Sequence, residues 1–145
     1  MKSAPVPTRP MDYISIDFFH FPKVEYDGVE FDQIMLIVCQ LSGYAVAVPG
    51  RKVGQTSEQT ARSLMHHWLE AFGVPSFILT DKGPQFIAAW WDQLCAALGI
   101  VHATAVTGRH QGNGKAEVTG KGIRLAIAKA RSIQPSLNWM ELIRT

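Results

Sequence analysis

The sequence predicts one α/β domain with a mixed five-stranded sheet, antiparallel over its first three strands and flanked by helices on both faces. Three observations lead to this prediction. The chain has 145 residues, which suffices for one domain with one core. Hydrophobic residues make up 47% and charged residues 18%, which argues against a disordered or fibrous chain. Strand-like and helix-like segments follow one another in the order βββαβαβα, which is typical of a mixed sheet with helices.

The first third of the domain has the pattern of an antiparallel meander. Three runs rich in aromatic and β-branched residues predict strands at 13–21, 31–40 and 44–48. Asp27-Gly28 lies inside the polar segment 23–30, and this dipeptide is typical of a hairpin turn. The second run is mainly apolar, as expected of a central strand covered on both faces.

Helical periodicity begins after Thr56 or Ser57, either of which can cap a helix, and it ends at Gly73. A short apolar strand at 77–80 comes next. A second helix then places four large apolar residues every fourth position toward the core: Phe86, Trp90, Leu94 and Leu98.

The last part of the chain continues the alternation. We expect a fifth strand at 101–106, a glycine-rich loop at 107–114, a long helix at 115–133 and a short helix around Trp139. Trp90 and Trp91 could also offer a base-stacking platform, although the helical spacing favours a core position for Trp90.

The chain ends and the cysteines give little sign of special chemistry. Residues 1–10 contain three prolines, so we expect a linker or leader before a domain at 11–145. No apolar run approaches the roughly 20 residues that a membrane span needs, which predicts a soluble, intracellular protein without membrane contact.

Cys39 and Cys95 are far apart, and we expect two buried thiols rather than a disulfide or a zinc site.

Positive charge is concentrated near the C-terminus. Residues 1–108 hold 7 basic and 10 acidic residues, whereas residues 109–145 hold 7 basic and 2 acidic ones. Such a basic segment favours a polyanionic partner such as nucleic acid. The alternative is an ordinary solvated helix face.

Three carboxylates occupy positions that suggest chemistry. Asp17 lies in the middle of a predicted strand, where a carboxylate is disfavoured. It is either a metal ligand held by the sheet or an edge-strand residue facing water. Asp81 follows the strand at 77–80, where sites in open sheets gather, although a turn-forming role is the alternative. Glu117 opens the long helix, where the helix dipole also favours an acid.

The local sequences around these acids resemble a known family. Asp81 and Glu117 are separated by 35 residues (82–116), which is the D,D-35-E spacing of integrase and transposase cores. The segments that resemble gypsy-type LTR-retrotransposon and retroviral integrases are Leu41–Ala45, His67–Leu69, Phe72–Pro75, Phe77–Phe86, Leu98–Ile100 and His110–Glu117. Together the resemblance covers about residues 11–133.

This resemblance implies an RNase H-like fold and a metal-dependent polynucleotidyl transferase. The family trims DNA 3′ ends and joins them to target DNA by in-line phosphoryl transfer. By resemblance, Asp17, Asp81 and Glu117 are the catalytic residues and the ligands of two Mg²⁺ or Mn²⁺ ions, with Asp17 bridging both. The implied partners are element-end DNA, target DNA and a second copy of the core, with a higher oligomer in the full-length complex and the nucleus as the place of action.

DNA contacts are expected along the glycine-rich loop and the long helix. Glu117, Lys121 and Arg124 share one helix face, and Lys115 lies nearby. In the family, basic residues at the places of Lys121 and Arg124 touch DNA ends, and an amide at the place of Asn113 contacts DNA near the cut. Gln111 is a weaker candidate.

Two other functions stay open at this point. One is an insertion-sequence transposase of the same fold. The other is a domesticated, integrase-derived module that binds DNA or a partner without activity. A serine or cysteine hydrolase is disfavoured because the sequence has no nucleophile elbow and no plausible Cys–His pair.

Overall fold

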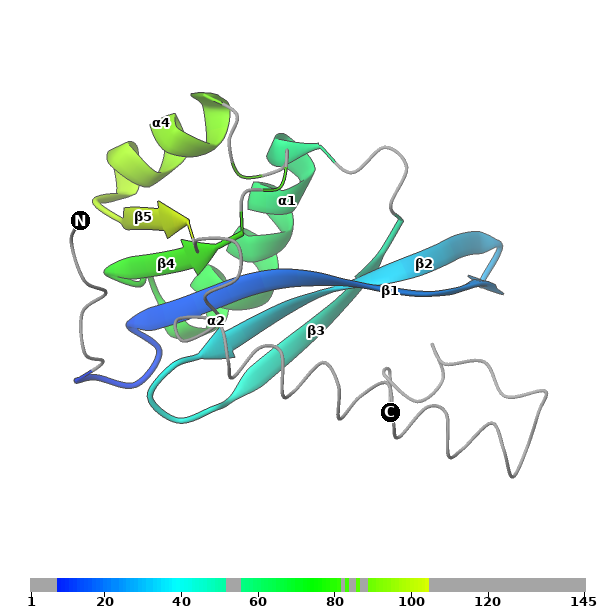
Figure 1. Ribbon diagram of the computed structural model, residues 1–145, viewed down its shortest axis with the longest axis horizontal. Coiled ribbons are helices and arrows are strands. Elements are labelled where there is room, and N and C mark those ends of the chain that lie inside the picture. The colour runs from blue at the N-terminus through cyan, green and yellow to red at the C-terminus, as the bar shows by residue number, and fades with distance from the viewer. Residues whose placement is uncertain (1–7, 52–55, 82, 84–85, 87–88, 105–145) are drawn as a thin grey trace.

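The computed structural model describes residues 8–51, 56–81, 83, 86 and 89–104, and its centre is one five-stranded sheet (Figure 1). The strands are β1 (Tyr13–Tyr26), β2 (Val29–Cys39), β3 (Ala45–Gly50), β4 (Phe77–Thr80) and β5 (Val101–Thr104). They lie in the order β3-β2-β1-β4-β5. The pairs β1–β2 and β2–β3 are antiparallel, whereas β1–β4 and β4–β5 are parallel. The predicted mixed sheet with an antiparallel first half is therefore confirmed.

The first hairpin is longer than the sequence predicted. The segment 23–30 was expected to be a turn, but β1 continues to Tyr26 and β2 begins at Val29. The turn itself consists of Asp27 and Gly28, whose φ angles of 53° and 76° match the twist of a two-residue hairpin. The prediction was wrong because the strands continue with polar residues past an irregularity between His20 and Val24, where the pairing register shifts.

The helical connection between β3 and β4 follows the predicted pattern. Three segments follow one another without a break: α1 (Ser57–Leu64), the π-helical η1 (Met65–Leu69) and α2 (Glu70–Phe72). Of the two candidate caps, Thr56 is the one used. Its side chain accepts a hydrogen bond from the Gln59 backbone N–H at 3.1 Å, and its own N–H donates to Gln59 Oε1 at 3.2 Å. Gly73, with φ of 87°, ends the run.

The helix between β4 and β5 is α4 (Ala89–Leu98). It buries Trp91 and Cys95 completely or almost completely, while Leu94 and Leu98 pack against the core from partly buried positions. Three residues of the predicted stripe, Phe86, Leu94 and Leu98, thus contribute to the core together with Trp91 and Cys95, and the side chain of Trp90 lies outside the described residues. Because Trp91 is fully buried, it offers no surface for base stacking.

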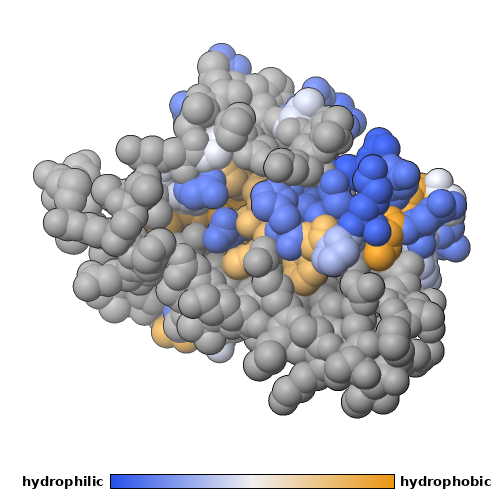
Figure 2. Space-filling view, turned by 45° about the vertical axis from the view of Figure 1, so that its right-hand side comes forward, coloured by the Kyte–Doolittle hydropathy of each residue, from blue (hydrophilic) through white to orange (hydrophobic). Residues whose placement is uncertain are grey.

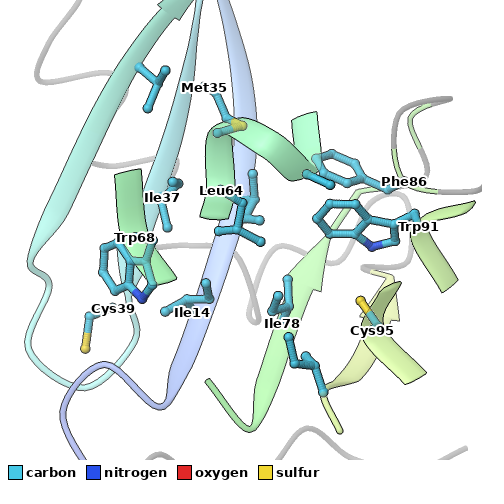
Figure 3. Close-up of a cluster of buried hydrophobic side chains, with 14 residues drawn as sticks. Ile14, Met35, Ile37, Cys39, Leu64, Trp68, Ile78, Phe86, Trp91 and Cys95 are labelled. Carbon is cyan, nitrogen blue, oxygen red and sulfur yellow. The ribbon is translucent and has the colours of Figure 1, made fainter. Parts of the chain in front are cut away.

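The hydrophobic core lies between the sheet and these helices (Figure 3). Even-numbered residues of β1, such as Ile14 and Ile16, meet α1, η1 and α4 there. Figure 3 shows Trp91 and Cys95 beside Ile78, with Trp68 near Cys39. Both cysteines are buried and free, as the sequence predicted. The predicted strand end at 105–106, the loop at 107–114 and the helices at 115–133 and around Trp139 lie outside the described residues.

The surface of the described part combines charged and apolar residues. Figure 2 shows hydrophobic residues next to hydrophilic ones on one face. The large apolar side chains with the greatest exposure are Val29, Leu41, Tyr44, Met65, Phe72, Val74 and Val101. Within the described ranges, no helix combines the length and the apolar character that a membrane crossing requires.

Candidate active site

Asp17 lies on β1, the middle strand of the five, opposite Leu36 of β2. The alternative of an edge-strand aspartate facing water is therefore wrong. The side chain is half-buried, and its Oδ1 accepts a hydrogen bond from the Phe18 N–H at 2.8 Å. The backbone at this position is paired with β2, so the sheet helps to preorganise the carboxylate.

Asp81 is the first residue after β4 and is also half-buried. Its Oδ1 accepts a hydrogen bond from the Gly83 N–H at 2.8 Å. This contact is typical of the turns that aspartate forms, so the turn-forming role is present. It also holds the carboxylate at the carboxyl end of β4, which is the edge where sites in open parallel sheets are found.

The parallel pairing of β1 and β4 brings these two acids together. The register runs from Tyr13 opposite Phe77 to Ile16 opposite Thr80. Asp17 and Asp81 are the residues that directly follow this last pair, so both lie at the end of the β1–β4 ladder. Ile16 belongs to the core beneath the helices, so strand alternation places Asp17 on the opposite face of the sheet.

Polar contacts continue along β1 on the face that carries Asp17. Ser15, two residues before Asp17, is fully buried. Its hydroxyl accepts a hydrogen bond from Gln40 Nε2 at 2.7 Å. Two residues after Asp17, Phe19 packs with the buried pair Leu36 and Val38. On this face Asp17 therefore lies between a buried polar side chain, Ser15, and an apolar one, Phe19.

A polar contact that sequence reasoning missed lies beneath Asp81. His102 had no obvious partner in the sequence, yet its Nε2 is 2.7 Å from the Thr80 hydroxyl and its Nδ1 is 3.6 Å from Asp92 Oδ1. Burial lowers the pKa of His102, and the nearby Asp92 carboxylate opposes that shift. No local sequence pattern reveals this contact, because it depends on the parallel register of β4 and β5. In that register His102 lies opposite Ile78, two residues before Thr80.

Two potential nucleophiles of the described chain, Cys95 and Thr80, are not poised for reaction. Burial, assisted by Asp92, raises the pKa of the Cys95 thiol to about 11, so this cysteine stays protonated at neutral pH. Thr80 is fully buried and has no access to a substrate.

All of the other predicted site residues lie outside the described residues. These are Gln111, Asn113, Lys115, Glu117, Lys121 and Arg124. Among the residues that are described, no three His, Cys, Asp or Glu side chains gather into a group able to hold a metal ion. Carboxylate oxygens are the ligands that Mg²⁺ and Mn²⁺ prefer, so the pair Asp17 and Asp81 fits part of such a site.

A comparison with protein families places the chain. The family described as "Integrase core domain" matches residues 7–110, well over half of the sequence. The chain belongs to the integrase core domain family. It is an integrase catalytic core of the retroviral type, and the predicted resemblance is confirmed.

Relatives of this integrase core are parts of retroviral polyproteins. It is 30% identical over 113 residues to the Gag-Pol polyprotein of avian reticuloendotheliosis virus, covering 78% of this chain and 10% of the polyprotein. It is 27% identical over 135 residues to the Pol polyprotein of feline endogenous virus ECE1, covering 93% of this chain and 12% of that one. The integrase core thus spans about a tenth of the length of these relatives.

Solved structures share the fold of this integrase core. An intasome of simian T-cell lymphotropic virus in complex with PP2A regulatory subunit B56 gamma superimposes with a TM-score of 0.71 at 26% identity, covering 89% of this chain and 44% of that chain. The HTLV-2 integrase catalytic core domain in complex with magnesium, in a dimeric form, gives 0.68 at 23% identity, covering 93% and 82%. The fold is therefore the RNase H-like fold of integrase catalytic cores, as the resemblance implied.

Proposed function

We propose that this integrase core trims the 3′ ends of element DNA and joins them to target DNA by in-line phosphoryl transfer. The observation that carries the proposal is that Asp17 and Asp81 directly follow Ile16 and Thr80, the last register pair of β1 and β4, in a chain that belongs to the integrase core domain family. Both carboxylates are half-buried, and each is oriented by a backbone N–H. Two fixed acids of this kind can hold the divalent cations that stabilise the negative charge of a phosphoryl transfer.

The proposed cofactors are two Mg²⁺ or Mn²⁺ ions held by Asp17, Asp81 and Glu117. When bound, such ions activate the attacking oxygen and stabilise the charge of the attacking and leaving oxygens. The chain supplies rigid ligands: β1 holds Asp17, and the end of β4 holds Asp81. Support comes from the donor chemistry of the two described acids and from the magnesium in the HTLV-2 structure of the same fold.

The proposed partners follow from the same family. They are element-end DNA and target DNA, contacted through Gln111, Asn113, Lys115, Lys121 and Arg124. We also propose a homodimer of the core, supported by the dimeric form of the HTLV-2 core, and a nuclear place of action for the full-length enzyme. The domain bounds of 11–145 stay a prediction.

The test is a comparison of three aspartate variants in metal binding and in DNA chemistry. We would measure Mn²⁺ binding by calorimetry for the wild type, Asp17→Asn and Asp81→Asn. For the same three proteins we would measure the splitting of a branched DNA, which is the reverse of strand transfer. Asp32→Asn on β2 is the matched control, because it makes the same change of charge on the same sheet. We expect both site variants to lose binding and activity, while the control keeps them.

The opposite outcome identifies a different function. Binding that survives both site variants would show that these acids are not the ligands. Metal-independent DNA binding without any strand transfer, even in the wild type with Mn²⁺, would favour the domesticated module instead.

A further inference from the structure

A buried hydrogen-bond chain lies on the helix side of the sheet, directly beneath Asp81. The Thr80 hydroxyl is 2.7 Å from His102 Nε2 and 2.9 Å from the backbone carbonyl oxygen of Asp81. Thr80 is fully buried, and the His102 side chain is only 8% exposed. Both contacts are within hydrogen-bond distance, so one hydroxyl connects a buried imidazole to the main chain of a site residue.

The single proton of the Thr80 hydroxyl fixes the direction of this chain. If the hydroxyl donates to the Asp81 carbonyl, it can only accept from His102, so Nε2 must carry a proton. The other nitrogen, Nδ1, is 3.6 Å from Asp92 Oδ1, which is too long for a good hydrogen bond. The Trp91 ring meets the imidazole at 75° with a centroid distance of 5.7 Å, which restricts the orientation of the imidazole ring.

The Asp81 carbonyl needs this partner because it lies beyond the sheet. Pairing of β4 with both neighbouring strands ends at Thr80. The Thr80 hydroxyl therefore restrains the Asp81 main chain just after the last paired residue, while the Gly83 N–H restrains its carboxylate. A ligand held at its main chain and at its side chain has little freedom left to lose when a metal binds.

We propose that Thr80 and His102 are positioning residues that hold Asp81 in its metal-binding geometry from the opposite face of the sheet. Neither residue touches substrate or metal; each acts through Asp81. The proposal rests on the proposed function of Asp81 as a metal ligand. Removal of a residue that holds a metal ligand through a hydrogen bond typically lowers metal affinity by about 10- to 100-fold.

The test uses two pairs of variants that remove or keep one hydrogen-bonding group. Thr80→Val removes the hydroxyl at nearly constant shape, and Thr80→Ser keeps it. His102→Leu removes the donor, and His102→Gln offers an amide N–H in place of Nε2–H. The first readout is hydrogen exchange of the Gly83 amide in the metal-free protein. The second is the Mn²⁺ concentration for half-maximal strand transfer.

We expect the donor-free variants, Thr80→Val and His102→Leu, to speed Gly83 exchange and to raise the half-maximal Mn²⁺ concentration about tenfold or more. The variants that keep the group, Thr80→Ser and His102→Gln, should stay near the wild type in both readouts. Urea unfolding of all four variants controls for stability. If Thr80→Val does not fold, the two His102 variants decide the question.

Two results would overturn the proposal. One is unchanged Gly83 exchange and metal dependence in the donor-free variants. The other is an equal loss in all four variants, which would indicate a packing role only. Failure of the proposed function looks different: the wild type itself would lack metal-dependent activity, while Gly83 exchange would still report whether Thr80 and His102 hold Asp81.

Discussion

The two faces of β1 differ in what their side chains do. Ile14 and Ile16 point to the helix face, where they are fully buried in one continuous core with α1, η1 and α4. Ser15 and Asp17 alternate with them and point to the opposite face, where Ser15 is hydrogen-bonded and Asp17 follows the last residue of β1 that pairs with β4. One strand thus contributes to the core with one set of residues and to the candidate site with the other.

This difference implies that substitutions can change the stability of this domain and its proposed activity separately. Residues of the helix face lose apolar contacts and buried volume when they are truncated, which costs stability. A conservative change at Asp17 keeps the backbone pairing and the Phe18 contact, so it changes mainly the chemistry. The four predictions below test this separation.

The largest effect on stability is expected from Trp91→Ala on the helix face. Trp91 is fully buried and packs against Phe86, with ring centroids 5.3 Å apart. Its truncation leaves a large cavity, and we expect the free energy of unfolding to fall by about 3–5 kcal/mol. Urea unfolding followed by circular dichroism measures this loss. A loss below about 1 kcal/mol would contradict the burial of this residue.

His102, which is buried on the helix face, should also make the free energy of unfolding depend on pH. The folded-state pKa of His102 is lowered from 6.5 by burial, so the unfolded chain binds more protons in mildly acidic solution. The free energy of unfolding should therefore decrease as the pH falls below about 6.5, by at most about 1.4 kcal/mol per pH unit for one proton.

Urea unfolding between about pH 5 and 7 checks this slope in the wild type and in His102→Gln. Burial and His66 also lower the pKa of His67, so that histidine contributes in the same direction. We expect His102→Gln to remove its own share and His67→Gln the remainder. An unchanged slope in His102→Gln would contradict the lowered pKa.

A smaller effect is expected at the start of α1. Thr56→Ala removes the hydroxyl that accepts from the Gln59 N–H and disrupts the reciprocal bond to Gln59 Oε1. Loss of such a cap costs about 1 kcal/mol, which thermal unfolding detects as a lower Tm. Thr56→Ser is the control, since it keeps the hydroxyl and should stay close to the wild type.

The smallest change in stability is expected at Asp17 itself. In Asp17→Asn the amide oxygen can still accept from the Phe18 N–H, so we expect the free energy of unfolding to change by less than about 1 kcal/mol. The same variant should lose the proposed activity. A large loss of stability would mean that Asp17 is a structural residue and that the two faces are not separable.

The sequence predicted most elements of the described sheet because their residues carry local signals. The aromatic and β-branched runs located five strands, and the spacing of apolar residues located the helices. The end of β1 was missed because Pro22 and Lys23 interrupt the pattern while the hairpin continues to Tyr26. The apolar spacing correctly placed Phe86, Leu94 and Leu98 at the core, but it did not reveal that Trp91 is fully buried as well.

The candidate site was only partly accessible from sequence. Asp17 and Asp81 were recognised through their context and their resemblance to integrases, and the structure places each of them directly after the last register pair of β1 and β4. The contact between Thr80 and His102 could not be predicted, because it depends on how β4 and β5 align rather than on any local pattern. The roles of Glu117 and of the proposed DNA-contacting residues remain predictions.

The parallel pairing of β1 with β4 has a consequence for the order of events during folding. The two strands pair with a constant offset of 64 residues, whereas β1 and β2 are joined by a two-residue turn. Closing the longer loop costs more chain entropy, so the hairpin can form early and the meeting of the two aspartates must come late. A chain emerging from the ribosome therefore has its first three strands available well before the two aspartates of the candidate site can approach each other.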